Sequence, residues 1–197
     1  QVASMSTAQV AAFETEDIGA MTTAQLAALT TTQVAALTTA QIVALGSEQA
    51  ASLKSSQLAV LTTAQLSSLE TEDLVALTTT QLKGFSSTQI ASLTTAQVAS
   101  LGTDQVAGLS TTQLVGLTTA QVVSLSNDQV AAMTTAQVAA LTTLQVVAME
   151  TSDVASITTS QIPALTTLQL SVMTTSQVAA FSDEQLAAMS SSQLNSF

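Results

Sequence analysis

Large apolar side chains recur along this chain with an eight-residue period that has no insertion or deletion. The repeating unit reads T-T-x-Q-V-A-A-L, as at 134–141, and we number its positions 1 to 8. Position 2 is always Thr, Ser, Asn or Asp. Position 4 is Gln, or Asp in three units. Position 5 is Val, Leu or Ile, apart from Ala50, and position 8 is always Leu, Met, Phe or Ile. Residues 1–197 are therefore predicted to be a single continuous array of 25 octad units with no linker.

An uninterrupted α-helix does not fit this period. Eight residues advance a helix by about 800°, so the apolar positions would spiral around it instead of forming one face. A coiled coil requires a seven- or eleven-residue pattern, which this chain does not have. A long helix or coiled coil is therefore excluded.

A chain of very short helices, one per octad, fits better. The invariably polar position 2 has the residue types that cap helix N-termini. If position 1 is the cap instead, T-x-x-Q is a capping box, in which Gln reaches back to the backbone N–H of the cap. Positions 5 and 8 then share one face. The sequence predicts an all-α solenoid, a superhelix of linked very short helices.

The acidic residues support this interpretation. All 13 lie in positions 1 to 4 of their octads. Six occupy position 3, in the first turn of the predicted helix, where the helix dipole favours negative charge. They are Glu16, Glu48, Glu72, Asp104, Asp128 and Glu184.

A β-solenoid is the alternative, because Thr and Val favour strands and stacked coils align identical side chains. Two features count against it. Positions 5 and 8 are an odd number of residues apart and would point to opposite faces of a strand. The chain also has only six Gly for turns.

Either solenoid is stabilised by neighbouring units, because one octad has only two large apolar side chains to bury. Natural arrays end in polar caps, whereas here the period runs undisturbed from Gln1 to Phe197 and the first residue is not Met. We interpret the chain as an excerpt or processed part of a longer array, or else as a protomer whose ends are covered by its neighbours.

The amino-acid composition narrows the range of possible functions. The chain has no Cys and no His, which argues against the usual zinc, haem and thiol sites and against His-based catalysis. No base is placed to activate a Ser or Thr, so we predict no enzyme and no cofactor. Two Lys against 13 acidic residues give a net charge of -11, which does not suit nucleic-acid binding. Mean hydropathy is +0.47, yet no apolar run is long enough for a membrane span.

One local motif suggests a metal. Glu at position 1 occurs three times, and in the same three octads Asp replaces Gln at position 4. Paired carboxylates with a Thr hydroxyl are hard oxygen ligands, so these octads are candidates for a weak Ca²⁺ site. A variant capping pair and duplication of one octad are the alternatives. The candidate residues are Glu14, Asp17, Glu70, Asp73, Glu150 and Asp153.

The unit T-T-x-Q-V-x-x-L resembles the octapeptide arrays of very large repetitive bacterial surface and secreted proteins, which are adhesion-like. That resemblance, with the acidic and repetitive composition, implies a structural protein outside the cell or on its surface. We expect it to form a fibre, stalk or matrix component by self-association or as part of a longer array. A repeat surface that binds a protein, polysaccharide or cell surface is the alternative, and interruptions of the Thr row such as Lys54 disfavour ice or crystal binding.

Overall fold

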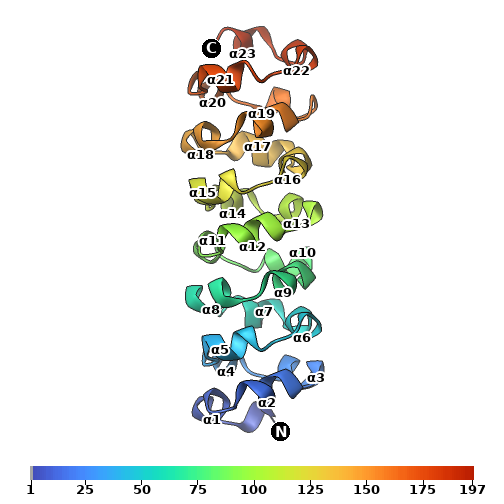
Figure 1. Cartoon of the computed structure of the whole chain (residues 1–197), viewed down its shortest axis with the longest axis vertical. Coiled ribbons are helices and arrows are strands. Elements are labelled where there is room, and N and C mark those ends of the chain that lie inside the picture. Colours follow the sequence, from blue (N-terminus) through green and yellow to red (C-terminus); the bar gives the residue numbers. More distant parts are fainter. Residues whose placement is uncertain (1) are drawn as a thin grey trace. The chain divides into compact units, whose positions relative to one another are not determined.

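The computed structural model describes residues 2–197 and divides into two compact units, Gln1–Leu101 and Gly102–Phe197, each of which we describe by itself. The first unit contains the 3-10 helix η1 and helices α1 to α12 (Figure 1). These elements are η1 Val2–Ser4, α1 Thr7–Ala11, α2 Thr15–Ala20, α3 Thr23–Ala27, α4 Thr31–Ala35, α5 Thr39–Val43, α6 Ser47–Ser52, α7 Ser55–Leu58, α8 Thr63–Ser68, α9 Thr71–Ala76, α10 Thr79–Leu82, α11 Ser87–Ala91 and α12 Thr95–Ser100.

The second unit continues the octad period with helices α13 to α23 and the 3-10 helix η2. These elements are α13 Thr103–Gly108, α14 Thr111–Val115, α15 Thr119–Val123, α16 Asn127–Ala132, α17 Thr135–Ala140, α18 Thr143–Ala148, α19 Thr151–Ser156, η2 Ile162–Ala164, α20 Thr167–Ser171, α21 Thr175–Val178, α22 Asp183–Ala187 and α23 Ser191–Leu194.

Both units are all-α, as the sequence predicts, and residues 2–197 contain no β-strand. The β-solenoid alternative is therefore wrong. Local capping accounts for this result, because each octad stabilises its own helix end before any long-range contact is made.

The capping residue is at position 1, so of the two capping alternatives the capping box is correct. In the third octad the Thr22 hydroxyl accepts a hydrogen bond from the Gln25 backbone N–H at 3.3 Å, and Gln25 Oε1 accepts one from the Thr22 N–H at 2.7 Å. The same reciprocal pair forms wherever position 1 is Thr or Ser at the start of an α-helix. Position 2 is the first helical residue, and the hydrogen bonds give no account of its uniform polarity.

The corners between helices are made without left-handed residues. Leu77 ends α9 with φ −68° and ψ 140°, and Thr78 begins the next octad with φ −71° and ψ 158°. No residue in 2–197 has a positive φ. Two consecutive extended residues redirect the chain, and any amino acid adopts that backbone. This explains how so many corners form with so few glycines.

Within each unit the chain coils so that a helix packs against the helix three octads on, as α6 does against α9 in the first unit and α16 against α19 in the second. Positions 5 and 8 line the inside of the coil: Leu66 is fully buried and Leu69 is 4% exposed. Helices of four to six residues are unstable alone. Burial of these two positions, together with the caps, stabilises them.

One complete octad among the described residues departs from the α-helical pattern. Pro163 lacks a backbone N–H, and the octad from Thr158 to Leu165 contains the 3-10 helix η2 in place of an α-helix. Gln161 keeps its role there, because its Oε1 still accepts a hydrogen bond from the Thr158 N–H at 2.7 Å. The proline changes the helix type and leaves the position-4 side chain in place.

Candidate functional site

The most regular polar feature of the structure is the buried Gln at position 4. Gln57 is 1% exposed and makes three hydrogen bonds. Its Oε1 accepts from the Lys54 N–H at 2.7 Å, and its Nε2 donates to the carbonyls of Leu26 and Leu29, each at 2.9 Å. One amide therefore caps its own helix and also joins it to the octad four units earlier.

This arrangement repeats with fixed spacing in both units. The Nε2 donates to the carbonyl 28 residues earlier, at position 8, and in most octads also to the carbonyl 31 residues earlier, at position 5. We call these side chains the clamp glutamines. Within single units they include Gln33, Gln41, Gln49, Gln57, Gln65, Gln81, Gln89 and Gln97, then Gln137, Gln145, Gln161, Gln169, Gln177, Gln185 and Gln193.

Sequence reasoning predicted the local half of this arrangement and missed the cross-coil half. A signal was present in the composition of position 4, which is Gln or Asp and never Glu. A capping box accepts Glu as readily as Gln, whereas only the amide has N–H groups to donate to two carbonyls. The exclusion of Glu therefore points to a donor role.

Two of the predicted Glu–Asp pairs keep part of the capping box. The Glu14 N–H donates to Asp17 Oδ2 at 3.3 Å, and the Glu150 N–H donates to Asp153 Oδ2 at 2.9 Å. Neither glutamate side chain caps its helix. Burial raises the pKa of the Asp153 carboxyl, the hydrogen bond from the Glu150 N–H lowers it, and the negative charge of Glu150 raises it.

The third pair is arranged differently. Asp73 is 2% exposed, and its Oδ1 accepts a hydrogen bond from the Ser47 hydroxyl at 3.1 Å. Its Oδ2 is buried and has no hydrogen-bond partner. Burial raises the pKa of the Asp73 carboxyl, the Ser47 hydrogen bond lowers it, and the charges of Glu70 and Glu72 raise it.

The structure does not gather these pairs into one acidic centre. Within residues 2–197 there is no group of three or more His, Cys, Asp or Glu side chains placed to hold a metal ion. No attractive contact between the two side chains explains why Glu at position 1 occurs together with Asp at position 4. Calcium binding by the Glu–Asp pairs stays a prediction.

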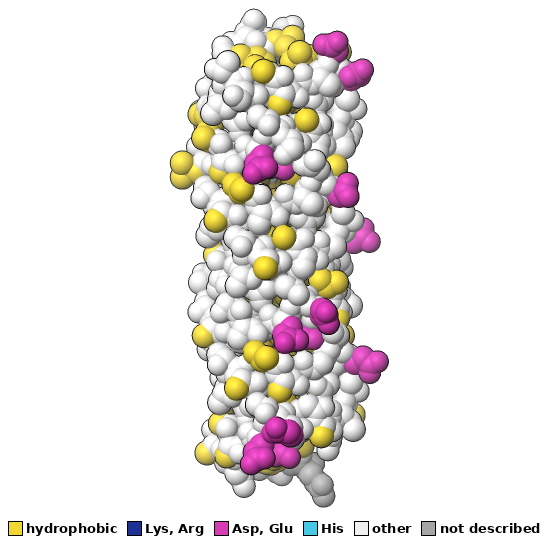
Figure 2. Space-filling model, viewed as in Figure 1, with side chains coloured by type: hydrophobic (Ala, Val, Ile, Leu, Met, Phe, Trp, Pro, Cys, Tyr) yellow, Lys and Arg dark blue, Asp and Glu magenta, His cyan; other side chains and the backbone are white. Residues whose placement is uncertain are grey.

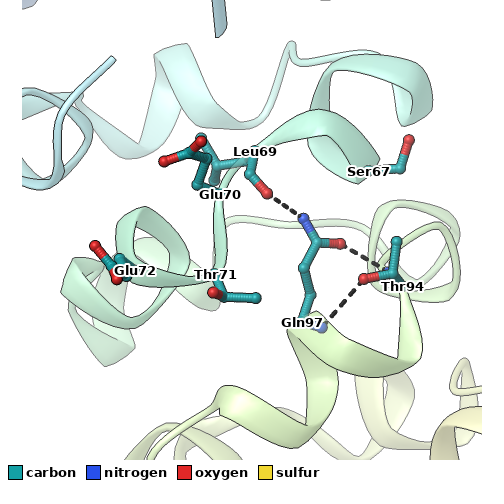
Figure 3. Close-up of a pocket in the computed structure, with 7 residues that line it drawn as sticks. All are labelled: Ser67, Leu69, Glu70, Thr71, Glu72, Thr94 and Gln97. Carbon is teal, nitrogen blue, oxygen red and sulfur yellow. Dashed lines mark hydrogen bonds between the residues drawn. The ribbon is translucent and has the colours of Figure 1, made fainter. Parts of the chain in front are cut away.

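A surface pocket of about 360 Å³ lies beside the Glu70 octad, between α8, α9 and α12 (Figure 3). Its lining is mostly polar: Ser67, Leu69, Glu70, Thr71, Glu72, Thr94 and Gln97. The clamp of Gln97 forms one wall, with Nε2 donating to the Leu69 carbonyl at 2.6 Å and Oε1 accepting from the Thr94 N–H at 2.7 Å. The pocket therefore has fixed backbone geometry and two carboxylates at its edge.

The outer surface is otherwise sparsely charged. Figure 2 shows acidic side chains as separate groups among largely uncharged atoms on the face that it draws. Two leucines at position 3 stand out from the surface, Leu144 at 73% and Leu168 at 64% exposed. Among the described residues no helix is long and apolar enough to cross a membrane.

The octad matches a known repeat family. Its sequence contains A-L-T-T-A-Q, for example at 36–41, where an octad ends and the next begins. The ALTTAQ repeat family matches residues 10–47, 66–103, 92–119, 106–143 and 146–183, which together cover well over half of the chain. No curated protein shows a significant match. The spacing of caps, clamps and buried apolar positions is thus that of a recognised repeat, and the chain belongs to the ALTTAQ repeat family.

Proposed function

We propose that this chain is a structural repeat segment that acts outside the cell or on its surface as part of a fibre, stalk or matrix. The observation that carries the proposal is the clamp. Most interior octads are joined to the octad four units earlier by the same kind of bonds, as Gln65 is to Val34 and Leu37. Such a coil lengthens by repetition of one contact, which is what a spacer or fibre requires.

The composition is consistent with this role. The repeated side chains are caps, clamps and core residues, so most of the sequence is used in holding the coil. We therefore propose a mechanical rather than a catalytic role, with no resident cofactor. The resemblance to repetitive bacterial surface proteins supports a place outside the cell.

We propose that self-association uses the first octads of the first unit and the last octad of the second unit. In the first octads the position-4 side chains of Gln9 and Gln25 are exposed. In the last octad Leu194 is 46% and Phe197 is 47% exposed, although the corresponding positions of interior octads are buried. Further octads, from the same chain or from a second copy, would supply the missing clamp carbonyls and apolar contacts.

Sedimentation velocity over a range of concentrations, with negative-stain electron microscopy, tests the proposal. We expect concentration-dependent association into filaments of constant width. Leu194→Glu combined with Phe197→Glu should abolish it, because each places a charge on the end face. Leu144→Glu is the matched control, since Leu144 is exposed on a helix flank and its replacement should leave association unchanged. A chain that stays monomeric at every concentration would contradict the fibre.

The alternative, a binding module, has one observation in its favour. Leu144 and Leu168 lie on α18 and α20, which pack against each other, so the two exposed leucines are on neighbouring helices. If the Leu144→Glu control abolished association while the end variants did not, contact through this flank would replace end-to-end growth.

A further inference from the structure

Asp73 occupies a clamp position without the clamp's donor group. In the octads on either side, Gln65 donates to the Leu37 carbonyl at 2.6 Å and Gln81 to the Leu53 carbonyl at 2.7 Å. By the same spacing, the carbonyls that correspond to Asp73 are those of Ile42 and Leu45. A carboxylate has no N–H, so Asp73 cannot donate to those carbonyls as Gln does at other clamps.

The side chain does reach that segment. Ser47, two residues beyond Leu45, donates its hydroxyl to Asp73 Oδ1 at 3.1 Å. Oδ2 is buried without a partner, in a side chain that is only 2% exposed. A buried unpartnered carboxylate oxygen is costly and calls for a compensating ion, water or proton.

We infer that Asp73 holds a calcium ion against the carbonyl oxygens of Ile42 and Leu45, with the Ser47 hydroxyl as a further oxygen of the site. The cation takes the place of the two N–H groups that Gln supplies at other clamps. Asp is shorter than Gln by one methylene, about 1.5 Å of reach. Added to the 2.6 Å and 2.7 Å of the neighbouring clamps, it gives an oxygen–oxygen separation of about 4 Å, which a bent O–Ca²⁺–O arrangement with bonds of about 2.3–2.6 Å spans.

The ligand types favour calcium. Carboxylate, main-chain carbonyl and hydroxyl oxygens are hard ligands, and Ca²⁺ accepts an irregular set of them, whereas Mg²⁺ demands near-ideal octahedral geometry. Glu70 and Glu72 add negative charge close to Asp73 without neutralising it. This ligand set differs from the Glu–Asp pair that the sequence suggests, because three of its oxygens come from the segment Ile42 to Ser47.

The other acidic octads serve as internal comparisons. Asp153 Oδ2 is occupied by the Glu150 N–H at 2.9 Å, so that side chain retains a capping role. Asp17 is exposed and lies in the second full octad, where the described chain provides no carbonyls 31 and 28 residues earlier. Asp73 is the one with a buried oxygen that has no partner.

The test is the thermal unfolding of the whole chain, followed by circular dichroism after removal of metal, in calcium or magnesium at matched ionic strength. Isothermal titration with CaCl₂ gives the affinity. We expect calcium to raise the midpoint of the wild type, with a dissociation constant of about 10⁻⁴–10⁻³ M as in low-charge extracellular sites. Asp73→Gln should fold, because it restores the family's own residue, and should weaken calcium binding by at least about tenfold.

The control is Asp104→Asn, which removes one exposed carboxylate that belongs to none of the Glu–Asp pairs and should respond to calcium as the wild type does. Ser47→Ala should weaken binding less than Asp73→Gln. Three results would overturn the inference: no response of the wild type to calcium, an equal response to magnesium, or an equal response of Asp73→Gln. The inference does not depend on whether the chain forms fibres.

Discussion

The first and third complete octads use Gln at position 4 in one way, and the later Gln octads of the first unit use it in two ways. Gln25 is exposed and bonds only to Thr22 of its own octad. Gln57 is buried, makes the same local bond to Lys54, and also clamps Leu26 and Leu29. The difference separates two functions of one side chain. Capping requires nothing outside the octad, whereas clamping requires an octad four units earlier.

The same contrast appears in the apolar positions. Position 8 is only partly buried at Phe13 and Met21, and is buried from Leu29 to Leu101 in the rest of the first unit. Position 5, by contrast, is fully buried already at Val10. Each octad therefore forms its capped helix by itself, including the first ones. Its position-4 amide makes cross-coil bonds, and its position-8 side chain is fully buried, only when other octads precede it. Stability should be lowest where those octads are missing.

The largest difference between the two regions is expected when the position-4 amide is removed from an octad of each. Gln57→Ala leaves the Lys54 N–H and the Leu29 carbonyl without a partner, whereas the Leu26 carbonyl still accepts from the Leu29 N–H at 3.1 Å. At about 1–3 kcal/mol for each buried group, we expect a loss of about 2–6 kcal/mol in the free energy of unfolding. Gln25→Ala should cost about 0.5–1 kcal/mol, because water replaces its single capping bond. Urea unfolding monitored by circular dichroism measures both. Equal losses would mean that the cross-coil bonds contribute nothing.

A pH series sharpens the comparison at the acidic octads. The pKa of the Asp153 carboxyl is raised in the folded chain, so its favourable contribution is complete below the unfolded pKa of 3.8 and is lost as pH rises through the folded value. Beyond the effect of burial, the charge that raises this pKa further is that of Glu150, the residue before α19. Asp153→Gln should therefore gain stability over the wild type progressively as the pH increases above about 4.

The control for that series is Asp17→Gln, which makes the same substitution at an exposed position. Unfolding midpoints at matched ionic strength across the acidic range measure both variants. An Asp153→Gln difference that is constant with pH would show that the gain comes from restored hydrogen bonds alone and not from removal of a buried charge.

Capping should show no contrast between the two regions. Thr22→Ala and Thr62→Ala each remove a hydroxyl that accepts from the N–H of the octad's own Gln, at 3.3 Å and 3.2 Å. Each substitution should cost about 1 kcal/mol, the usual effect of losing a Thr cap. Lys54→Thr adds a cap that its helix lacks and should stabilise by a similar amount. If Thr62→Ala cost much more than Thr22→Ala, capping and clamping would be coupled.

Much of this fold could be predicted because its determinants lie within eight residues. The octad period excluded a long helix, position 1 and position 4 formed a capping box, and positions 5 and 8 formed the core. The number of octads per turn of the coil could not be predicted, since the octads are alike and contain no residue that identifies which of them are in contact. For that reason the clamp partners of Gln57, 28 and 31 residues earlier, were not predictable.

The candidate site shows the same limit. The sequence singled out Asp73 through its pairing with Glu70, but the contact in the structure is with Ser47, 26 residues earlier. The distinction among Asp17, Asp73 and Asp153 also depends on the coil, because their octads have identical or nearly identical position 1 to 4 sequences. Their different burial comes from the octads that precede them and not from their own residues.

The smallest expected effect is also the most specific to the clamp. Gln25→Glu keeps an oxygen that accepts from the Thr22 N–H, so it should change the free energy of unfolding by less than about 0.5 kcal/mol. Gln57→Glu keeps the same local bond to Lys54 but turns a carboxylate toward the Leu26 and Leu29 carbonyls, and should destabilise at least as much as Gln57→Ala. Urea unfolding of the two Glu variants at neutral pH compares the regions with a single substitution. If Gln57→Glu hardly changed the free energy of unfolding, the donor role of the amide would be contradicted and the exclusion of Glu from position 4 would have no physical cause. The expected contrast between the two Glu variants would instead attribute that exclusion to the two cross-coil hydrogen bonds.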